Sequence, residues 1–265
     1  MAIKKIILIT IIFNFSHILC SQTKNIVLER KDNGIRFIEN RKTGKHIIKD
    51  KNNRIIFENL RGLEDLGNGY QAINSKNELI YFTIKKDTVE LKSNVDEVKR
   101  FYMVCGTVPS YKVSIKDTLN HFEIILKTDN TWLNQENTIS TITTISKDDA
   151  DDCFFINFEK EFSYENYPSI NHILNIPYEN PDSVIFKKNN LYGIFKKTKA
   201  IYSEISIVKL LTKVKKENLY SYYEINKTPK YKELGEFIGA FARFELVNGK
   251  KGYLTGNGYE YIDEQ

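Results

Sequence analysis

Two eight-residue stretches near the end of the chain decide the fold: Phe186–Gly193 reads FKKNNLYG and Val214–Ser221 reads VKKENLYS. The second follows the first by 28 residues, and a period of this size is typical of solenoid and propeller repeats. Each stretch has an apolar residue, two lysines, an asparagine-containing turn and an aromatic residue, in the order expected for a strand, a tight turn and a second strand. The repeat therefore predicts an array of β-hairpins.

The rest of the chain shows short apolar runs that alternate with Lys, Asn and Asp. Tyr and Phe number 16 each and Pro only 5, a composition that favours strands over loops. The predicted strands are 34–39, 78–84, 111–115, 122–127, 153–158, 184–186, 192–195, 219–225, 242–247 and 252–254. Helical turns are expected only at 95–101 and 206–213. The predicted fold class is all-β, built from short antiparallel hairpin units.

Composition divides the part of the chain that follows its first 21 residues into three segments. Residues 22–131 are predicted to form an N-terminal β region, and residues 153–265 a C-terminal repeat region. Between them, residues 132–152 are rich in Asn, Thr, Ser and Asp and are predicted to be a polar connection.

The N-terminus has the pattern of a secretory signal peptide. Met1–Lys5 is short and basic, and Ile6–Phe15 is an apolar run broken only by Thr10 and Asn14, too short to span a bilayer. Cleavage after Ser21 would give a mature chain that starts at Gln22. The alternatives are cleavage after Cys20, lipidation of Cys20 as the first residue of a lipoprotein, and a buried strand or core helix of a cytosolic domain.

The charge and hydropathy of the chain indicate where the protein is located and which classes of partner it can bind. The formal net charge is +5, with 39 basic and 34 acidic residues interspersed, whereas nucleic-acid binders concentrate Lys and Arg on one face. No later apolar run approaches the 18 to 20 residues that a membrane helix needs. We therefore expect an exported protein, periplasmic, on the outer surface or secreted, with no nucleic-acid partner and no membrane span in the mature chain.

The C-terminal segment resembles the WG repeat, a bacterial β-hairpin motif. Phe244–Asp263 reads FELVNGKKGYLTGNGYEYID, with the aromatic, the basic and glycine turn, the aromatic-glycine pair and the Ile-bearing strand of that repeat. Tyr192–Phe195 (YGIF) and Leu219–Tyr222 (LYSY) are similar to the same unit, and Arg36–Ile48 is similar to a degenerate copy. The tryptophan of the motif is not kept, and Ser221 replaces one glycine.

The resemblance implies stacked hairpins that share a core, because one hairpin alone buries too little apolar surface to be stable. It predicts these repeat-core residues: Tyr192, Gly193, Tyr202, Tyr220, Tyr231, Gly252 and Tyr253. Tyr192, Tyr220 and Tyr253 are expected to fill equivalent positions in their repeats. The alternative is an ordinary antiparallel β fold whose hairpins share only their turn residues.

Two cysteines remain after signal removal, Cys105 and Cys153. In an exported protein they can close a disulfide, and the alternative is two separately buried thiols. Neither lies in a C-x-x-C pair or beside a histidine, which excludes the usual redox and metal motifs.

No catalytic motif is present in the sequence. His46, His121 and His172 lie in separate segments without a metal or triad pattern, and there is no nucleophile elbow or phosphate loop. We therefore assign no catalytic, cofactor or metal residues. The one acidic cluster is Asp148, Asp149, Asp151 and Asp152; Ca²⁺ binding there is a hypothesis, and a solvated turn is the simpler interpretation.

These observations favour an exported, non-catalytic binding or scaffold protein of the bacterial cell envelope. Its partner would be a protein, a peptide or a glycan, held on one face or at an open strand edge. The alternative is a secreted or periplasmic glycan-directed enzyme whose carboxylates are brought together only by the fold.

Overall fold

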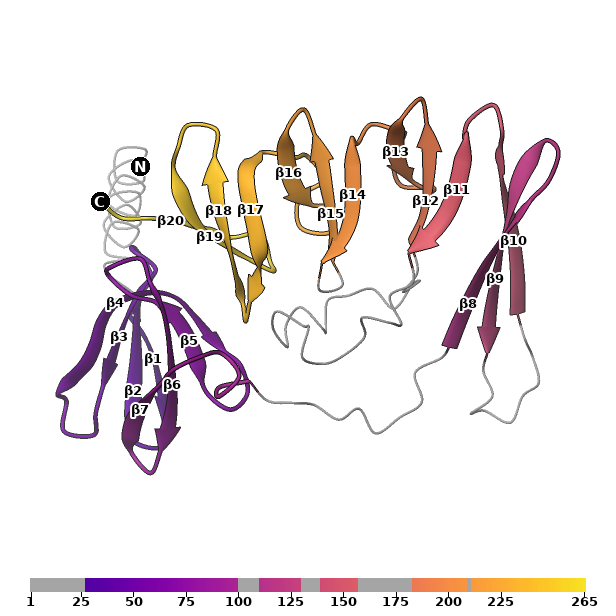
Figure 1. Ribbon diagram of the computed structural model, residues 1–265. Coiled ribbons are helices and arrows are strands. Elements are labelled where there is room, and N and C mark those ends of the chain that lie inside the picture. The colour runs from indigo at the N-terminus through magenta and orange to yellow at the C-terminus, as the bar shows by residue number, and fades with distance from the viewer. Residues whose placement is uncertain (1–26, 100–109, 130–138, 157–182, 209–210) are drawn as a thin grey trace, which may run out of the picture. The chain divides into compact units, whose positions relative to one another are not determined.

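The computed structural model describes residues 27–99, 110–129, 139–156, 183–208 and 211–265, and their regular structure is entirely β (Figure 1). Consecutive strands pair antiparallel, which confirms the predicted array of short hairpins. These ranges contain no helix suited to crossing a membrane. The chain forms two compact units, called here unit 1 (Met1–Asp65 and Gly69–Val98) and unit 2 (Leu66–Asn68 and Lys99–Gln265).

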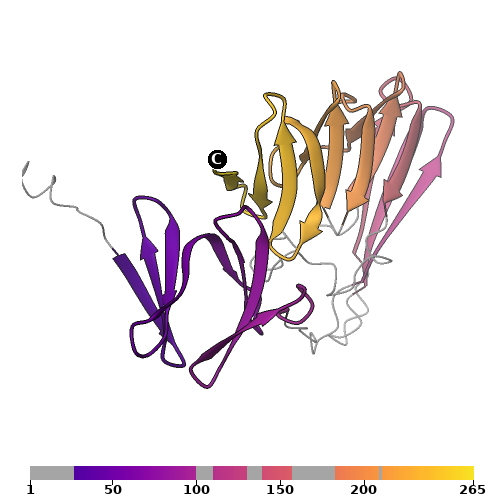
Figure 2. The same ribbon diagram turned by 60° about the vertical axis from the view of Figure 1, so that its left-hand side comes forward.

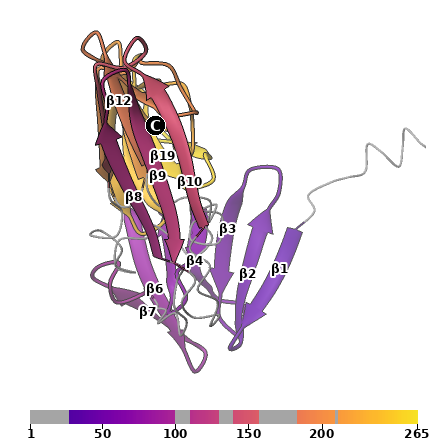
Figure 3. The ribbon, with the colours of Figure 1, turned by 90° about the vertical axis from the view of Figure 1, so that its right-hand side faces the viewer.

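Unit 1 contains a seven-stranded meander in which each strand pairs with the next along the chain. The strands are β1 (Val27–Asp32), β2 (Ile35–Asn40), β3 (Lys45–Lys49), β4 (Ile55–Asp65), β5 (Tyr70–Ile73), β6 (Leu79–Lys85) and β7 (Thr88–Lys92). Figure 3 shows β1, β2 and β3 side by side. Such up-and-down order follows from short turns, because a two-residue turn can only join antiparallel neighbours.

Strand β4 bends, and the bend folds the meander over its own core (Figure 2). Asn59 and Gly62 have left-handed φ angles of 54° and 55°, and the pairing with β5 shifts register between Arg61 and Glu64. A bulge of this kind increases local twist and redirects the strand. The two halves then enclose one cluster of buried side chains: Ile35, Phe37, Ile48, Leu60, Tyr70, Ala72 and Phe82.

Unit 2 contains three sheets that again follow chain order. The strands are β8 (Ser110–Asp117), β9 (His121–Asp129), β10 (Ile139–Ser146), β11 (Asp152–Ile156), β12 (Ser183–Lys188), β13 (Leu191–Ile194), β14 (Glu204–Val208), β15 (Leu211–Lys216), β16 (Leu219–Tyr222), β17 (Tyr231–Ile238), β18 (Phe241–Leu246), β19 (Lys251–Thr255) and β20 (Glu260–Ile262). Sheets β8–β10 and β11–β13 have three strands each, and β14–β20 form a seven-stranded sheet.

Three copies of one three-stranded motif follow each other in unit 2: β11–β13, β14–β16 and β17–β19. Their strand registers are equivalent, because each copy has one row of three residues that lie side by side across its strands. The rows are Cys153, Phe186 and Gly193; Ile205, Val214 and Ser221; and Leu234, Phe244 and Gly252. The repeat seen in the sequence is therefore a repeat of structure.

Within each row a small residue lies beside a larger one. A Cβ atom at Gly193 would come 2.5 Å from Cε1 of Phe186, and one at Gly252 would come 2.8 Å from Cζ of Phe244. Each phenyl ring thus occupies the space above its glycine. In the middle copy the ring is replaced by the shorter Val214, and the small residue is Ser221. This pairing explains why one repeat tolerates serine in place of glycine.

The turns of the first two copies have the same geometry. Asn189 and Asn190 have φ angles of 52° and 63°, and Glu217 and Asn218 have 53° and 64°. Two consecutive left-handed residues make the tight hairpin turn whose twist matches that of the flanking strands. The last strand of each copy is followed by a matching turn, because Asn226 donates its backbone N–H to the carbonyl of Tyr222 as Thr198 does to that of Ile194.

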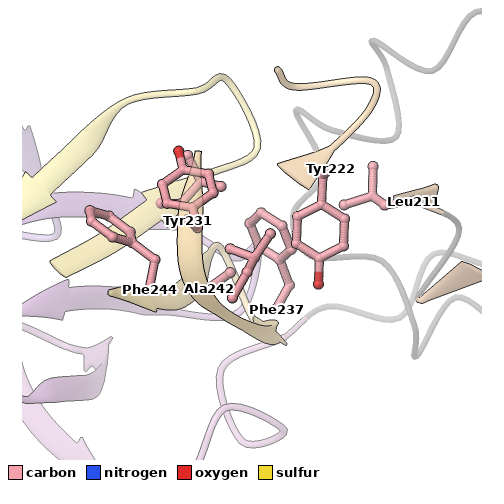
Figure 4. Close-up of a cluster of buried hydrophobic side chains, with 8 residues drawn as sticks. Leu211, Tyr222, Tyr231, Phe237, Ala242 and Phe244 are labelled. Carbon is pink, nitrogen blue, oxygen red and sulfur yellow. The ribbon is translucent and has the colours of Figure 1, made fainter. Parts of the chain in front are cut away.

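Adjacent copies share their cores. Val214 packs with Ile185, Ile194 and Tyr202, whereas Tyr222, on the adjoining strand, packs with Phe244 and its neighbours. Figure 4 shows this second cluster, in which the rings of Tyr222 and Phe237 lie 5.4 Å apart and those of Tyr231 and Phe244 5.0 Å apart. Each copy therefore depends on the next for burial of its apolar face.

The structure separates the predicted repeat-core residues into two groups. Tyr202 and Tyr231 are 1% exposed, and both Gly193 and Gly252 are buried. Tyr192, Tyr220 and Tyr253 are only half-buried.

The predicted equivalence of the three tyrosines is corrected by the register. Tyr192 and Tyr220 precede the small residue of their copy, whereas Tyr253 follows it and corresponds to Tyr222. Tyr253 therefore lies two positions further along its strand than Tyr192 and Tyr220 do, on the same side of the strand, and it does not share their position in the repeat. The buried tyrosine of the middle copy is Tyr222, at 0% exposure.

Three expectations about secondary structure and boundaries need correction. The predicted helical turn at 206–213 belongs to β14 and β15, and residues 95–98 form a non-helical turn. The predicted polar connection contains β10, because its alternating Ile and Thr residues are β-branched and suit a strand. The compact units divide near Val98.

Candidate ligand pocket in unit 1

A hollow of about 330 Å³ lies at one end of the unit 1 core. Its floor is apolar and is made by Phe37, Leu63 and Tyr70. Its rim is charged and is made by Glu29, Arg30, Glu39, His46 and Asp65. Pockets that combine an apolar floor with a few polar groups are the usual form of small-molecule sites.

The alternation of β2 and β3 explains why the core opens here. Ile35, Phe37 and Glu39 share one face of β2, and Ile35 and Phe37 are 0% and 5% exposed. On β3, Ile48 lies opposite Phe37, and His46 lies opposite Glu39. The inward face is thus apolar at Ile35 and at the pair of Phe37 and Ile48, and then changes to a carboxylate and an imidazole. Since these groups do not pack as aliphatic side chains do, the core ends in a polar hollow.

The aromatic floor is held in place by contacts on several sides. The Tyr70 ring lies 4.9 Å from that of Phe37 and stacks at 5.3 Å on that of Phe82. The Arg30 guanidinium lies over both floor rings, 5.5 Å from the centroid of Phe37 and 5.6 Å from that of Tyr70. Such cation–π contacts fix the positions of the arginine and of the two rings.

The Tyr70 hydroxyl connects the floor to the rim. It donates a hydrogen bond to Oδ2 of Asp32 at 2.9 Å and accepts one from Nη2 of Arg30. The same nitrogen lies 3.4 Å from Oδ2 of Asp65. Burial and the hydrogen bond to Asp32 raise the pKa of Tyr70, so the hydroxyl stays protonated.

Glu29 is neutralised by a partner outside the pocket. Both of its carboxylate oxygens accept hydrogen bonds from the Arg36 guanidinium, at 2.7 and 2.8 Å. This two-point contact lowers the pKa of Glu29, and the geometry is the favoured one for an arginine and a carboxylate.

Glu39 and His46 form the remaining part of the rim. Within the described ranges, no hydrogen bond or ion pair reaches the Glu39 carboxylate. Burial lowers the pKa of His46 below its usual 6.5, and the nearby Glu39 opposes this shift. His46 is therefore a neutral imidazole at pH 7, and Glu39 carries the charge at this end of the hollow.

The predicted acidic cluster does not converge. Asp151 accepts hydrogen bonds from the Lys188 ammonium at 3.0 Å and from the Asn189 backbone N–H at 2.7 Å, so it joins the β10–β11 turn to the β12–β13 turn. Asp148, Asp149 and Asp152 are exposed. Among the described residues no group of His, Cys, Asp and Glu is arranged to hold a metal ion. The Ca²⁺ hypothesis for Asp148, Asp149, Asp151 and Asp152 therefore receives no geometric support.

The cysteines and the other histidines belong to unit 2 or lie outside the described residues. Cys153 is a free buried thiol, and it occupies the row position that Ile205 and Leu234 fill in the later copies. Cys20, Cys105 and His172 lie outside the described residues. His121 is on β9, with Nε2 3.4 Å from Oε1 of Glu123.

Sequence reasoning missed the pocket, although one signal was present. Ile35, Phe37 and Glu39 alternate as an inward face should, and a charged residue at the third position marks the end of a core. The other rim residues come from β1, β3 and β4, and only the fold brings them together.

No protein-family model, no curated protein and no solved structure matches this chain.

Proposed function

We propose that this protein is an exported, non-catalytic binding protein in which unit 1 holds a small ligand and unit 2 is a WG-repeat-like scaffold. One observation carries the proposal: the hollow in unit 1 combines an aromatic floor with a charged rim. Its volume of about 330 Å³ lies at the small end of the range for ligand sites. Export rests on the signal-like N-terminus, Met1–Ser21.

The fixed polar network of the pocket supports a binding role. Arg30, Tyr70 and Asp32 form a continuous chain of hydrogen bonds, and the rings below them are stacked. A site whose side chains are already ordered loses little conformational entropy when a ligand enters. Preorganisation of this kind favours recognition.

The repeat geometry of unit 2 supports the scaffold role and the resemblance to WG repeats. Three copies share one register and one sequence of large and small residues. Stacked repeats of this type give a rigid body whose exposed face can be varied without loss of the core. A protein, peptide or glycan partner at the cell envelope is the class that such a face would serve.

The glycan-directed enzyme is the second candidate, because three carboxylates line the hollow. A glycosidase needs two of them, one with a raised pKa that allows it to donate a proton. Here Glu29 is bound to Arg36, which lowers its pKa, and Asp65 faces Arg30. This pairing leaves Glu39 alone and favours binding over hydrolysis. Turnover of chromogenic glycosides that is abolished by Glu39→Gln would instead support the enzyme.

A fragment screen tests whether the hollow is a binding site. The mature chain would be screened against a library of small molecules by ligand-observed NMR, alongside Leu63→Trp, which fills the hollow. Leu119→Trp is the matched control, since Leu119 is 90% exposed and belongs to unit 2, on the turn between β8 and β9. We expect hits that bind the unmodified chain and Leu119→Trp but not Leu63→Trp.

The screen needs a folding check and has a clear negative result. Circular dichroism and the melting temperature establish that Leu63→Trp is folded. If every hit binds the folded Leu63→Trp as well as the unmodified chain, the hollow is not the binding site and the proposal fails.

A further inference from the structure

The charges around the unit 1 pocket do not balance. Glu29 is neutralised by Arg36, and Asp65 by Arg30. His46 is neutral, so it adds no positive charge. Glu39 remains as a carboxylate with no hydrogen-bonding partner among the described residues. Among the described residues that line the hollow, Glu39 is therefore the carboxylate without a cationic partner, and it lies beside an apolar floor.

We propose that the pocket takes a small monocation, a protonated amine with an apolar body, whose ammonium group binds the Glu39 carboxylate. This inference rests on the proposed function, because it requires that the hollow be a binding site. It adds the chemical class of the ligand. A partly enclosed carboxylate and an ammonium form a charge-assisted hydrogen bond, which is among the strong polar contacts.

The floor sets the nature of the rest of the ligand. Phe37 and Tyr70 present aromatic surface, and Leu63 presents aliphatic surface. A volume of about 330 Å³ lies at the small end of the range for ligand sites, so a small ligand suits the hollow better than a drug-sized one. An arylalkylamine has the required size, apolar body and charge.

Arg30 determines where the cation is placed. Its guanidinium already lies over the Phe37 and Tyr70 rings, and it repels a second cation on that side. Glu39 is two residues further along β2 from Phe37, opposite His46 on β3. The repulsion by Arg30 and the attraction by Glu39 both direct an ammonium group to the β2–β3 end of the hollow.

The surrounding titratable groups predict how binding depends on pH. Glu29 and Arg30 face the hollow from β1, Glu39 from β2, His46 from β3, Asp65 from β4 and Tyr70 from β5. As the pH falls below 6.5, His46 begins to take up a proton, and its positive charge then opposes the ammonium group and offsets the charge of Glu39. Binding of the amine should therefore weaken between pH 7.5 and pH 5.

Three matched probes test the inference: 2-phenylethylamine, a cation; 2-phenylethanol, neutral; and 3-phenylpropionate, an anion. Each is titrated by NMR into the mature chain at pH 7.5, and into the variants Glu39→Gln and Glu58→Gln. Glu58 is an exposed carboxylate on β4 of the same unit and serves as the control. We expect the amine to bind about tenfold more tightly than the alcohol, as hydrogen bonds to charged groups do.

The variants should distinguish recognition of the ammonium charge from recognition of the apolar body of the ligand. Glu39→Gln should remove the preference for the amine and leave the affinity for the alcohol unchanged, and Glu58→Gln should keep the preference. Equal affinities for amine and alcohol, or tighter binding of the anion, would overturn the monocation and leave the proposed binding function standing. If none of the three probes binds, the arylalkylamine class is rejected, and the fragment screen with Leu63→Trp decides separately whether the hollow binds anything.

Discussion

The ring of Phe186 lies across from Gly193 so closely that a Cβ atom at position 193 would stand 2.5 Å from Cε1. The same relationship joins Phe244 to Gly252, and Val214 with Ser221 is its reduced form. The size of one residue in each copy thus contributes to setting the size of its neighbour on the adjoining strand, together with backbone atoms of Lys199 beside Gly193 and of Tyr261 beside Gly252. This rule arises from packing, and it gives a direct test of the repeat.

Gly193→Ser should destabilise unit 2 by about 1–3 kcal/mol, the usual cost of overpacking a core. Addition of Phe186→Val should recover part of this loss, because the double variant copies the pair Val214 and Ser221. Urea denaturation of the two single variants and the double variant measures the coupling between the two sites. Gly235→Ser is the control, since a Cβ at Gly235 meets nothing closer than 3.4 Å. Strictly additive losses would contradict the packing rule.

Tyr222→Ala should cost about 3–5 kcal/mol, as expected for a buried aromatic side chain, because Tyr222 is 0% exposed and its hydroxyl donates to the Gly235 carbonyl at 2.9 Å. Tyr192→Ala should cost about 1 kcal/mol, because Tyr192 is half-buried. The free energies of unfolding of the two variants should therefore differ clearly. Equal losses would show that the half-buried Tyr192 contributes as much to stability as the buried Tyr222.

The contact of Asp151 with the β12–β13 turn should make the stability of unit 2 sensitive to acid. The hydrogen bond from the Asn189 backbone, and then Lys188, lower the pKa of Asp151 below 3.8. A carboxyl group with a lowered pKa stabilises the fold above its unfolded value, and this contribution is lost as the pH falls through its folded value. The stability difference between the unmodified chain and Asp151→Asn should be present at pH 6 and shrink towards pH 2. A difference that is constant with pH would exclude this role; Asp149→Asn is the exposed control.

His46 should reduce the stability of unit 1 in mild acid. Burial lowers the pKa of His46 below 6.5, so the unfolded chain binds a proton more readily than the folded one. The folded state therefore loses stability as the pH falls below 6.5. His46→Gln should lose less stability than the unmodified chain between pH 7 and pH 5, and His121→Gln should behave like the unmodified chain. Identical pH profiles for all three would contradict the burial of the imidazole.

Cys153 should react slowly with alkylating reagents in the native protein. Burial raises the pKa of its thiol to about 11, and only the thiolate is nucleophilic. Iodoacetamide at pH 8, followed by mass spectrometry, should modify Cys153 quickly in urea and hardly at all without it. Resistance to modification in urea that disappears after reduction would instead establish the disulfide with Cys105 predicted from the sequence.

Cys153→Val provides the matching test of the repeat position. Ile205 and Leu234 fill the same place in the later copies, so a valine of similar volume should cost less than about 1.5 kcal/mol. A loss well above this value would indicate that the first copy requires a thiol rather than any apolar group.

Several features of the fold could be predicted because they depend on short-range chemistry. The FKKNNLYG and VKKENLYS stretches both indicate tight turns, since each has at least one Asn, a residue that tolerates left-handed φ angles, at the turn. Alternating apolar residues specify strands, and their even spacing specifies a meander. The resemblance to the WG repeat, rather than this short-range chemistry, named Tyr202, Tyr231, Gly193 and Gly252, and all four are buried.

Other features escaped sequence reasoning because they depend on which strands face each other. Tyr192 and Tyr253 look equivalent in sequence, yet one precedes and the other follows the small residue of its copy, so they occupy positions two residues apart in the repeat. The Thr-rich segment that contains β10 was predicted to be a polar connection. That prediction gave more weight to the polarity of the segment than to its β-branched residues, which favour a strand.

For this protein, sequence alone determined the all-β class, the hairpin turns and the 28-residue repeat, because each depends on the conformational preferences of a few neighbouring residues. Only the tertiary structure decided which rings are buried, where unit 1 ends and which charges meet at its open end. The rim residues Arg30, Glu39, His46 and Asp65 come from four strands. Strand pairing places Arg30, Glu39 and His46 on three neighbouring strands, and Asp65 joins them from the end of β4, beyond the bend.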